Sequence, residues 1–119
     1  MPSAVRSSTG IALSCVALVA AWGPPADAAA YRSCRPVMDP YPGTRYEGED
    51  LRQIRALRVS CATARGVARG AHREALESAP PPSGIRRFEW RGWRVRGDLR
   101  RASDRYLATK GGRRVRWVF

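Results

Sequence analysis

The stretch VSCATARGVARGAHREALESAPPP, residues 59–82, carries the clearest helical pattern in this chain of 119 residues. Ser60 is a favoured helix N-cap, because its hydroxyl can accept a hydrogen bond from the first turn. The prolines that begin at Pro80 end the pattern, since they cannot donate backbone hydrogen bonds within a helix. The sequence therefore predicts a helix that begins at Cys61 and packs closely against a sheet, with arginines on its opposite side. Its narrow apolar face consists of Cys61, Ala64, Val67, Ala68, Ala71 and Ala75.

The ten residues before this helix allow two interpretations. In one, a longer helix runs from Asp50, because Ile54 and Leu57 continue the spacing of three and four residues. In the other, the chain from Ile54 to Val59 is extended, and the helix begins only after Ser60. The β-branched Val59 directly before a good N-cap favours the second interpretation, so we expect the shorter helix.

From Ile85 onward the hydrophobic period changes to two, which is typical of strands that bury one face. Gly92 lies inside the first alternating run, and a glycine there suggests a β-bulge. The sequence KGG at residues 110–112 is a turn signal between the last two strands. We therefore expect an α+β domain over residues 51–119, in which one main helix packs on a small antiparallel sheet with an arginine outer face. The apolar residues expected inside are Phe88, Trp90, Trp93, Val95, Val115, Trp117 and Phe119.

The first 30 residues have the organisation of a secretory signal peptide. A polar segment with Arg6 precedes the apolar run IALSCVALVAAW at residues 11–22, and a Gly-Pro-Pro break and an alanine-rich segment follow. That run rises only about 18 Å as a helix, whereas the hydrocarbon core of a membrane is about 30 Å thick. We therefore expect residues 1–30 to be removed by cleavage after Ala28 or Ala30, which leaves a secreted or envelope protein without a stable membrane span.

Between the signal peptide and the domain, residues 31–50 are rich in proline and glycine and have no period, so we expect an irregular arm. Cleavage would remove Cys15 and leave Cys34 and Cys61 in an oxidising compartment, where an even pair predicts a disulfide. A disulfide that closes this loop would stabilise the folded state by about 3 kcal/mol on the chain-entropy model, because it lowers the conformational entropy of the unfolded chain. We therefore expect the disulfide to tie the arm to the start of the helix.

The helix motif VSCATARGVA at residues 59–68 is followed by GWR at residues 92–94 and RRVRW at residues 113–117. This order resembles a group of small exported, disulfide-containing proteins of high-GC Gram-positive bacteria, which share a VSCxxAxxVA helix and a terminal RRVxF-type strand. The resemblance covers most of the mature chain and implies a fold and a compartment, but no activity. Where that group carries a second cysteine pair in the sheet, this chain has Val95 and Ala108. The resemblance thus implies that these two side chains face each other on neighbouring strands.

The residue types give no support to a catalytic or metal site. His72 is the only histidine, and on one helix it would lie about 16 Å along the axis from Cys61, too far for a Cys–His dyad. We expect His72 to be a solvated or half-buried helix residue. The cysteines and the histidine lack the spacing of a zinc site, and no phosphate-binding glycine loop precedes a helix. We therefore expect neither an enzyme nor a bound cofactor or metal.

Arginine is the remaining signal for function, because the chain has 21 Arg against one Lys and a net charge of +12. Guanidinium groups interleaved with tryptophans can bind polyanions through bidentate contacts and stacking, which makes anionic envelope polymers or surfaces the expected partners. Codon bias in a GC-rich genome is the other explanation, since a half-buried sheet needs a polar outer face in any case. The candidate polyanion-binding residues are Arg91, Arg94, Arg96, Arg100, Arg101, Arg114 and Arg116.

A second hypothesis treats the protein as a protein-binding module, such as an inhibitor or an envelope interaction partner, that presents a loop from a disulfide-tied scaffold. Export argues against intracellular nucleic acid as the partner. Salt separates the two hypotheses, because binding to a polyanion weakens steeply with ionic strength, whereas loop docking does not.

Overall fold

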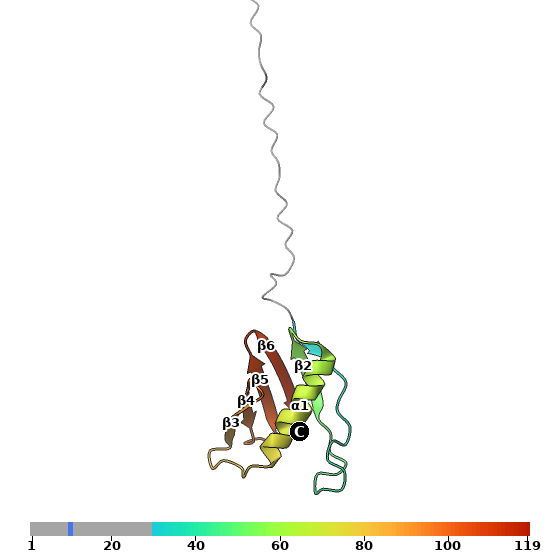
Figure 1. Cartoon of the computed structure of the whole chain (residues 1–119), viewed down its shortest axis with the longest axis vertical. Helices are drawn as coiled ribbons and strands as arrows, with labels where there is room; N and C mark the ends of the chain where they lie inside the picture. Colours follow the sequence, from blue (N-terminus) through green and yellow to red (C-terminus); the bar gives the residue numbers. More distant parts are fainter. Residues whose placement is uncertain (1–9, 11–29) are drawn as a thin grey trace, which may run out of the picture.

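The computed structural model describes residue 10 and residues 30–119, so the expected signal peptide lies almost wholly outside the described residues (Figure 1). One helix packs on a six-stranded antiparallel sheet with the strand order β1-β2-β6-β5-β4-β3. This arrangement confirms the predicted α+β fold class. In chain order, the elements are β1 (Arg32–Ser33), β2 (Arg52–Leu57), α1 (Cys61–Leu76), β3 (Ile85–Trp90), β4 (Trp93–Asp98), β5 (Arg105–Lys110) and β6 (Arg113–Val118).

The helix α1 begins where its N-cap predicts. The Ser60 hydroxyl accepts a hydrogen bond from the backbone N–H of Thr63 at 3.1 Å, and the ten preceding residues contain the strand β2. The shorter of the two predicted helices is therefore the correct one. Small side chains on the buried face let the helix lie close to the sheet. That face consists of Ala64, Val67, Ala68, Ala71, His72 and Ala75.

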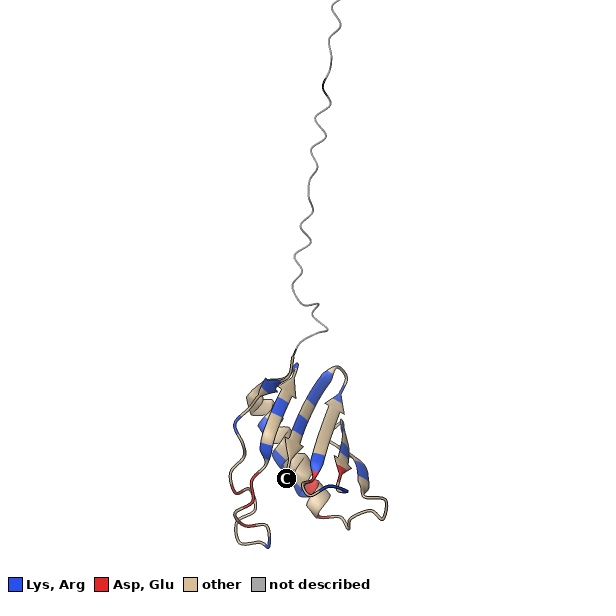
Figure 2. Cartoon of the chain, turned by 180° about the vertical axis from the view of Figure 1, so that it is seen from behind, with Lys and Arg blue, Asp and Glu red and all other residues tan. Residues whose placement is uncertain are grey.

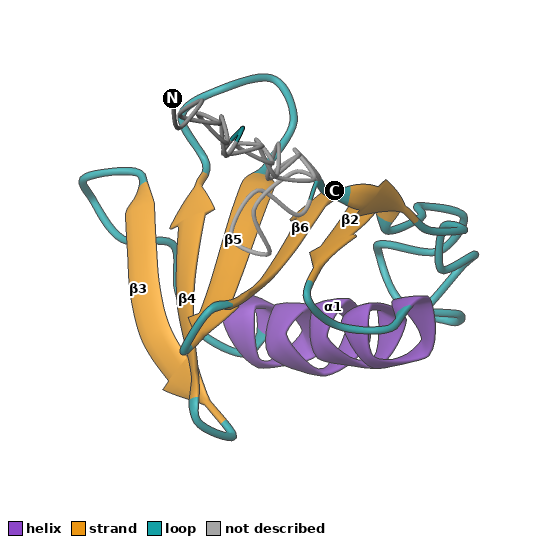
Figure 3. Ribbon diagram, turned by 90° about the horizontal axis from the view of Figure 1, so that it is seen from above, coloured by secondary structure: helices purple, strands orange, loops and turns teal. Residues whose placement is uncertain are grey.

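The helix connects two distant parts of the sheet. The chain leaves β2, crosses one face of the sheet as α1 and enters β3 at the far edge (Figure 3). Three hairpin connections then bring β6 back beside β2, where Ala56 pairs with Val115. We call the face against α1 the inner face and the opposite face the outer face.

The inner face has the aromatic character that the alternation predicts. Trp93 and Trp117 are buried, while Phe88, Trp90 and Phe119 are half-buried and pack against the core. Val95 and Ala108 are register partners on β4 and β5 and are both buried, so the prediction that they face each other is confirmed.

Gly92 has a different role from the one predicted. Trp90 pairs directly with Trp93, and Arg91 and Gly92 form the two-residue turn between β3 and β4 with φ angles of 46° and 80°. Positive φ at both positions is typical of a type I′ hairpin turn. The predicted bulge at Gly92 is therefore wrong. A register shift occurs instead in β2, where Gln53 has a φ of 51°.

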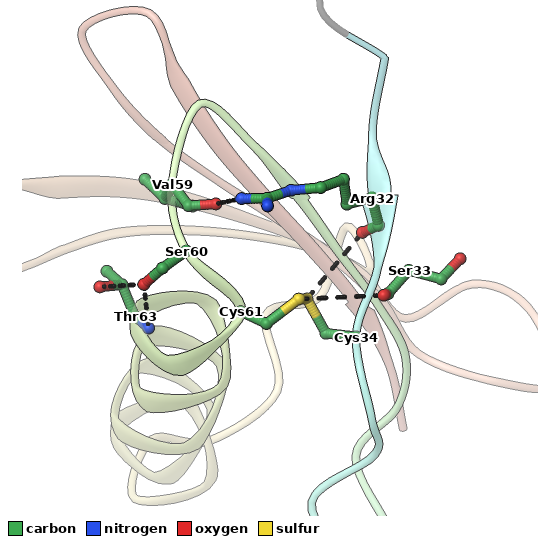
Figure 4. The surroundings of a disulfide bond; sticks show 7 residues. All are labelled: Arg32, Ser33, Cys34, Val59, Ser60, Cys61 and Thr63. Atoms are coloured by element: carbon green, nitrogen blue, oxygen red, sulfur yellow. Dashed lines mark hydrogen bonds between the residues drawn. A yellow bond between two sulfur atoms is a disulfide. The ribbon is translucent and has the colours of Figure 1, made fainter.

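The arm is joined to the domain at several points. Cys34 and Cys61 form the predicted disulfide, and their Cα atoms lie 5.4 Å apart (Figure 4). Arg32 extends the sheet as part of β1 and donates a hydrogen bond to the Val59 carbonyl at 2.8 Å. Val37 is buried in the hydrophobic core. The arm thus contributes to the core as well as to one edge of the sheet.

Candidate functional site

A row of arginines crosses the outer face of the sheet. Alternate residues of each strand point to this side, so register partners on neighbouring strands lie next to one another. Arg87 pairs with Arg96, Arg96 with Leu107, Leu107 with Arg116, and Arg116 with Arg55. We call the four arginines of this series the arginine row. With strands about 4.8 Å apart, the row spans roughly 19 Å from β3 to β2.

Like charges meet directly at two points of the arginine row. Arg87 lies opposite Arg96, and Arg55 lies opposite Arg116. Within the part of the chain that the structure describes, Arg55, Arg87 and Arg96 have no ion pair and no side-chain hydrogen bond. Directly opposed like charges destabilise a sheet, so the fold tolerates positive charge here that it does not neutralise.

Two hollows lie along the row on the outer face. One of about 430 Å³ is lined by arginines of β2, β4, β5 and β6, by Arg101 and by a single acidic residue, Asp98. The other, of about 560 Å³, lies over β3, β4 and β5. Arg96 and Leu107 line both hollows, so the two form one basic surface. Figure 2 shows the molecule from behind, with Lys and Arg on several neighbouring strands.

Most of the predicted arginines lie on or beside this surface. Arg94 and Arg114 flank the row, and each is a register partner of Thr109 on β5. Arg96 and Arg116 belong to the row, and Arg101 lines the first hollow. Sequence reasoning missed Arg55, Arg87 and Arg105. The signal that could have found Arg55 is the inward alternation of Ile54 and Ala56 around it.

Arg91 and Arg100 have other environments. Arg91 lies at the β3–β4 turn, with its guanidinium carbon 4.9 Å from the centre of the Trp90 ring. The Arg100 side chain donates two hydrogen bonds of 3.0 Å to Asp98. These bonds hold the pKa of Asp98 well below its usual range. The charge of Arg100 is therefore paired with Asp98, and Arg100 is not part of the arginine row.

Stacking by tryptophan is not available on the outer face. Trp93 and Trp117 are 5% and 1% exposed and belong to the inner face, as the alternation predicts, so neither can stack on a ligand bound at the outer face. The aromatic ring next to the row is that of Tyr31, which lies 4.6 Å from the guanidinium carbon of Arg116. Contacts with a ligand on this face would therefore depend on guanidinium groups.

His72 lies in a different environment from the one predicted. It is completely buried, and its Nδ1 atom lies 2.6 Å from the hydroxyl oxygen of Tyr41. Tyr41 comes from the arm and covers the helix, which is why the prediction of a solvated or half-buried His72 is wrong. Burial, assisted by the charge of Arg86, lowers the pKa of His72 to about 4. Burial raises the pKa of Tyr41, so the two groups are neutral partners at pH 7.

The fold and the outer face define a small disulfide-tied α+β domain with one strongly basic sheet face. In residues 30–119, no group of three or more His, Cys, Asp and Glu side chains is placed to hold a metal ion. No helix of the described chain is long and apolar enough to cross a membrane. Comparisons with protein-family models, curated proteins and solved structures found no match.

Proposed function

We propose that the protein is an exported, non-catalytic domain that binds anionic polymers of the cell envelope through the arginine row. The observation that carries this proposal is the direct opposition of like charges at Arg87–Arg96 and Arg55–Arg116. Such pairs lower stability. Two residues further along β3, on the same face, Glu89 lies opposite Arg94, so like charges do not meet there. Codon bias raises the number of arginines, but it does not require two of them to face each other.

A linear polyanion fits the dimensions of the row. Each guanidinium can make bidentate contacts with a phosphate or carboxylate group, and the row places four of them along roughly 19 Å. Leu107 lies in the middle of the row, where it offers an apolar contact to the polymer backbone. Bound anionic groups would neutralise the charges of the Arg–Arg pairs. The repulsion within these pairs would then be lower in the complex than in the free protein, which favours binding.

Export is part of this proposal. The Cys34–Cys61 disulfide supports it, because such bonds persist in oxidising compartments outside the cytosol. N-terminal sequencing of protein recovered from the culture medium should find residue 29 or residue 31 first. Protein that keeps Met1 and stays in the cytoplasm would overturn this part of the proposal.

The binding experiment uses the chain from Tyr31, which contains every described strand and the helix. Affinity for a glycerol-phosphate polymer is measured over a series of salt concentrations, since log K for binding to a polyanion falls linearly with log salt. R55Q/R96Q removes two charges of the row. R69Q/R73Q is the matched control, because it removes the same charge from the exposed side of α1.

We expect R55Q/R96Q to bind about tenfold more weakly, with a salt slope reduced by roughly two, because two phosphate contacts are lost. R69Q/R73Q should change affinity much less. Equal losses in both variants would show that only net charge matters, and the row would not be the site. Binding of wild-type protein that does not depend on salt would favour the protein-binding module instead.

A further inference from the structure

The strand β3 (Ile85–Trp90) leaves one edge of the sheet open. Its neighbour on one side is β4, and in the sheet of the described chain no strand lies on its other side (Figure 3). The opposite edge, β1, has only two residues. A six-residue edge strand is a template for pairing with another chain, because its outward N–H and C=O groups lack backbone partners.

The turn between β3 and β4 decides which backbone groups face outward. In a two-residue hairpin, the flanking residues, here Trp90 and Trp93, exchange both backbone hydrogen bonds. Hydrogen-bonded and non-hydrogen-bonded pairs then alternate along β3. The backbone N–H and C=O groups of Phe88 therefore bond to β4, while those of Arg87 and Glu89 point away from the sheet. The bond from Leu99 N–H to the Gly84 carbonyl, at 2.8 Å, follows the same alternation.

Two residues of β3 carry the free groups. Ile85 has local partners, because its N–H donates to the Ser83 hydroxyl at 3.2 Å and its carbonyl accepts from that hydroxyl at 3.3 Å. Arg87 and Glu89 remain, both exposed. They carry opposite charges and lie two residues apart on the outer face. This edge therefore has a charge pattern that is complementary to itself in antiparallel pairing.

We propose that β3 pairs with β3 of a second copy of this chain, antiparallel and about a two-fold axis at Phe88. In this register, Arg87 lies opposite Glu89 of the second copy, and the reverse pair follows by symmetry. Each pair exchanges two backbone hydrogen bonds, since both residues present outward groups. The two Phe88 side chains, half-buried in the single chain, meet on the inner face.

Charge selects this register among its neighbours. A shift by two residues in one direction places Arg87 opposite itself, and a shift in the other direction places Glu89 opposite itself. Like charges directly opposed destabilise a strand pair. The favoured register also brings a carboxylate next to Arg87, which within its own chain faces Arg96. A hollow of about 430 Å³ beside Phe88, between β3 and the C-terminal end of α1, is available for side chains of the second copy.

This dimer would join the two outer faces into one surface, because pairing in the plane of the sheet keeps inner and outer sides together. The inference rests on the edge of β3 and stands without the proposed function. Net charge works against association, since residues 31–119 of each copy carry the whole formal charge of +12. At an ionic strength of about 0.5 M the Debye length falls to about 4 Å, so long-range repulsion is screened while contact pairs persist.

The test is analytical ultracentrifugation of the chain from Tyr31 at that ionic strength, from micromolar to millimolar concentration. We expect a reversible dimer, and a dissociation constant about tenfold higher for R87E and for E89R, because each places like charges in both symmetric pairs. The double variant R87E/E89R should regain the wild-type constant. A wild-type chain that stays monomeric throughout, or a double variant no better than the single ones, would overturn the proposal.

Cysteine substitution checks the register independently. F88C places two thiols on the two-fold axis at a non-hydrogen-bonded pair, with Cα atoms about 4.5 Å apart, within the range for a disulfide. E89C is the control, because two copies of residue 89 would lie about 8 Å apart, too far to bridge. We expect a covalent dimer on oxidation of F88C and none with E89C. Equal cross-linking of both would exclude this register.

Discussion

His72 and Tyr41 form a polar contact inside the core, where the charged Arg86 is also buried. Phe119 packs beside the imidazole, with ring centres 4.2 Å apart, and Tyr106 meets it edge-on at 5.1 Å. The tyrosine hydroxyl can donate to Nδ1 only while the histidine is neutral. A buried polar pair of this kind depends on the protonation state of both partners, because a charged imidazole here would have no solvent and no counter-ion.

This contact predicts that stability falls in mild acid. The folded pKa of His72, about 4, lies below its ordinary value of 6.5, so the unfolded chain binds the proton more readily. The stabilising effect is complete above pH 6.5 and is lost as the pH falls towards 4. Between pH 7 and pH 5 we expect a loss of about 2 kcal/mol in the free energy of unfolding.

Urea unfolding at several pH values measures this loss. H72Q is the control, because glutamine cannot titrate in this range and its stability should change little between pH 7 and pH 5. Parallel pH profiles for wild type and H72Q would show that another group is responsible.

The burial of His72 could be predicted only in part. Ala64, Ala68 and His72 are four residues apart and share one helix face, so the period alone places the imidazole inside. The polarity of the residue argued for solvent. Its partner Tyr41 belongs to the arm, which has no period, and so the hydrogen bond to Nδ1 of His72 cannot be found from the sequence.

Two glycines in α1 differ in what surrounds them. A Cβ atom added at Gly66 would have no other heavy atom within 4 Å, whereas one added at Gly70 would lie 2.1 Å from the Trp90 ring. Gly70 is therefore where the helix and β3 come closest, and its lack of a side chain makes room for a large aromatic ring. Helix propensity favours alanine equally at both positions, so packing alone separates them.

Alanine substitutions should therefore have opposite effects. G66A should raise the free energy of unfolding by about 1 kcal/mol, because it restricts the unfolded chain and improves helix propensity. G70A should lower it by about 1–3 kcal/mol, because the ring of Trp90 has to move. Thermal unfolding followed by circular dichroism measures both. If G70A is as stable as G66A, the close approach of α1 and β3 is not a constraint.

The pair Val95 and Ala108 offers a site for a new disulfide. In the hairpin between β5 and β6, Lys110 lies opposite Arg113, and these two residues exchange backbone hydrogen bonds. Because bonded and non-bonded pairs alternate, the N–H and C=O groups of Ala108 point towards β6. Val95 and Ala108 therefore form a non-hydrogen-bonded pair between β4 and β5. Non-hydrogen-bonded pairs hold their Cα atoms about 4.5 Å apart, inside the range for a disulfide. This geometry follows from the strand register alone.

We predict that V95C/A108C forms a bridge and raises the free energy of unfolding by about 1–3 kcal/mol, with the loss of the valine methyl groups offsetting part of the gain. Mass spectrometry detects the bond, and chemical unfolding with and without reductant gives its effect. V95C/L107C is the control, because the side chain of residue 107 points to the outer face. A bridge in the control, or none in V95C/A108C, would contradict the register.

Turns and strands differ in how well the local sequence defines them. The glycines at residues 111–112 lie between two alternating runs, so their turn was predictable. At Gly92, Trp90 and Trp93 are both inward although three residues apart, and a two-residue turn explains this spacing as well as a bulge does. The shift at Gln53 in β2 depends on pairing with β6, far along the chain, and no local pattern indicates it.

The arginine row exists only because of long-range pairing. Arg55 on β2 meets Arg116 on β6 after the chain has formed the helix and three further strands. Sequence alternation places each arginine on the outer face, but it cannot tell which arginines become neighbours. Four of the seven predicted residues, Arg94, Arg96, Arg114 and Arg116, lie on strands of this face, whereas the opposition of like charges emerges only from the complete sheet.

That opposition leads to a prediction that links stability to binding. Arg96 and Arg94 lie on the same strand and the same face, yet Arg96 faces Arg87 whereas Arg94 faces Glu89. R96E should raise the free energy of unfolding by about 1 kcal/mol, because a repulsive cross-strand pair becomes attractive, and R94E should lower it by a similar amount. Both variants change the net charge equally, so their difference reports the neighbours and not the total charge.

Binding should follow a different order from stability. R96E, the more stable variant, should bind a glycerol-phosphate polymer more than about tenfold more weakly than wild type, since it places a carboxylate within the row. R94E, although less stable, should retain more affinity because it lies beside the row. Urea unfolding and salt-dependent binding of the two variants provide the measurement. If R96E is no more stable than wild type, then the Arg87–Arg96 contact carries no cost, and the main support for a selected anion-binding face disappears.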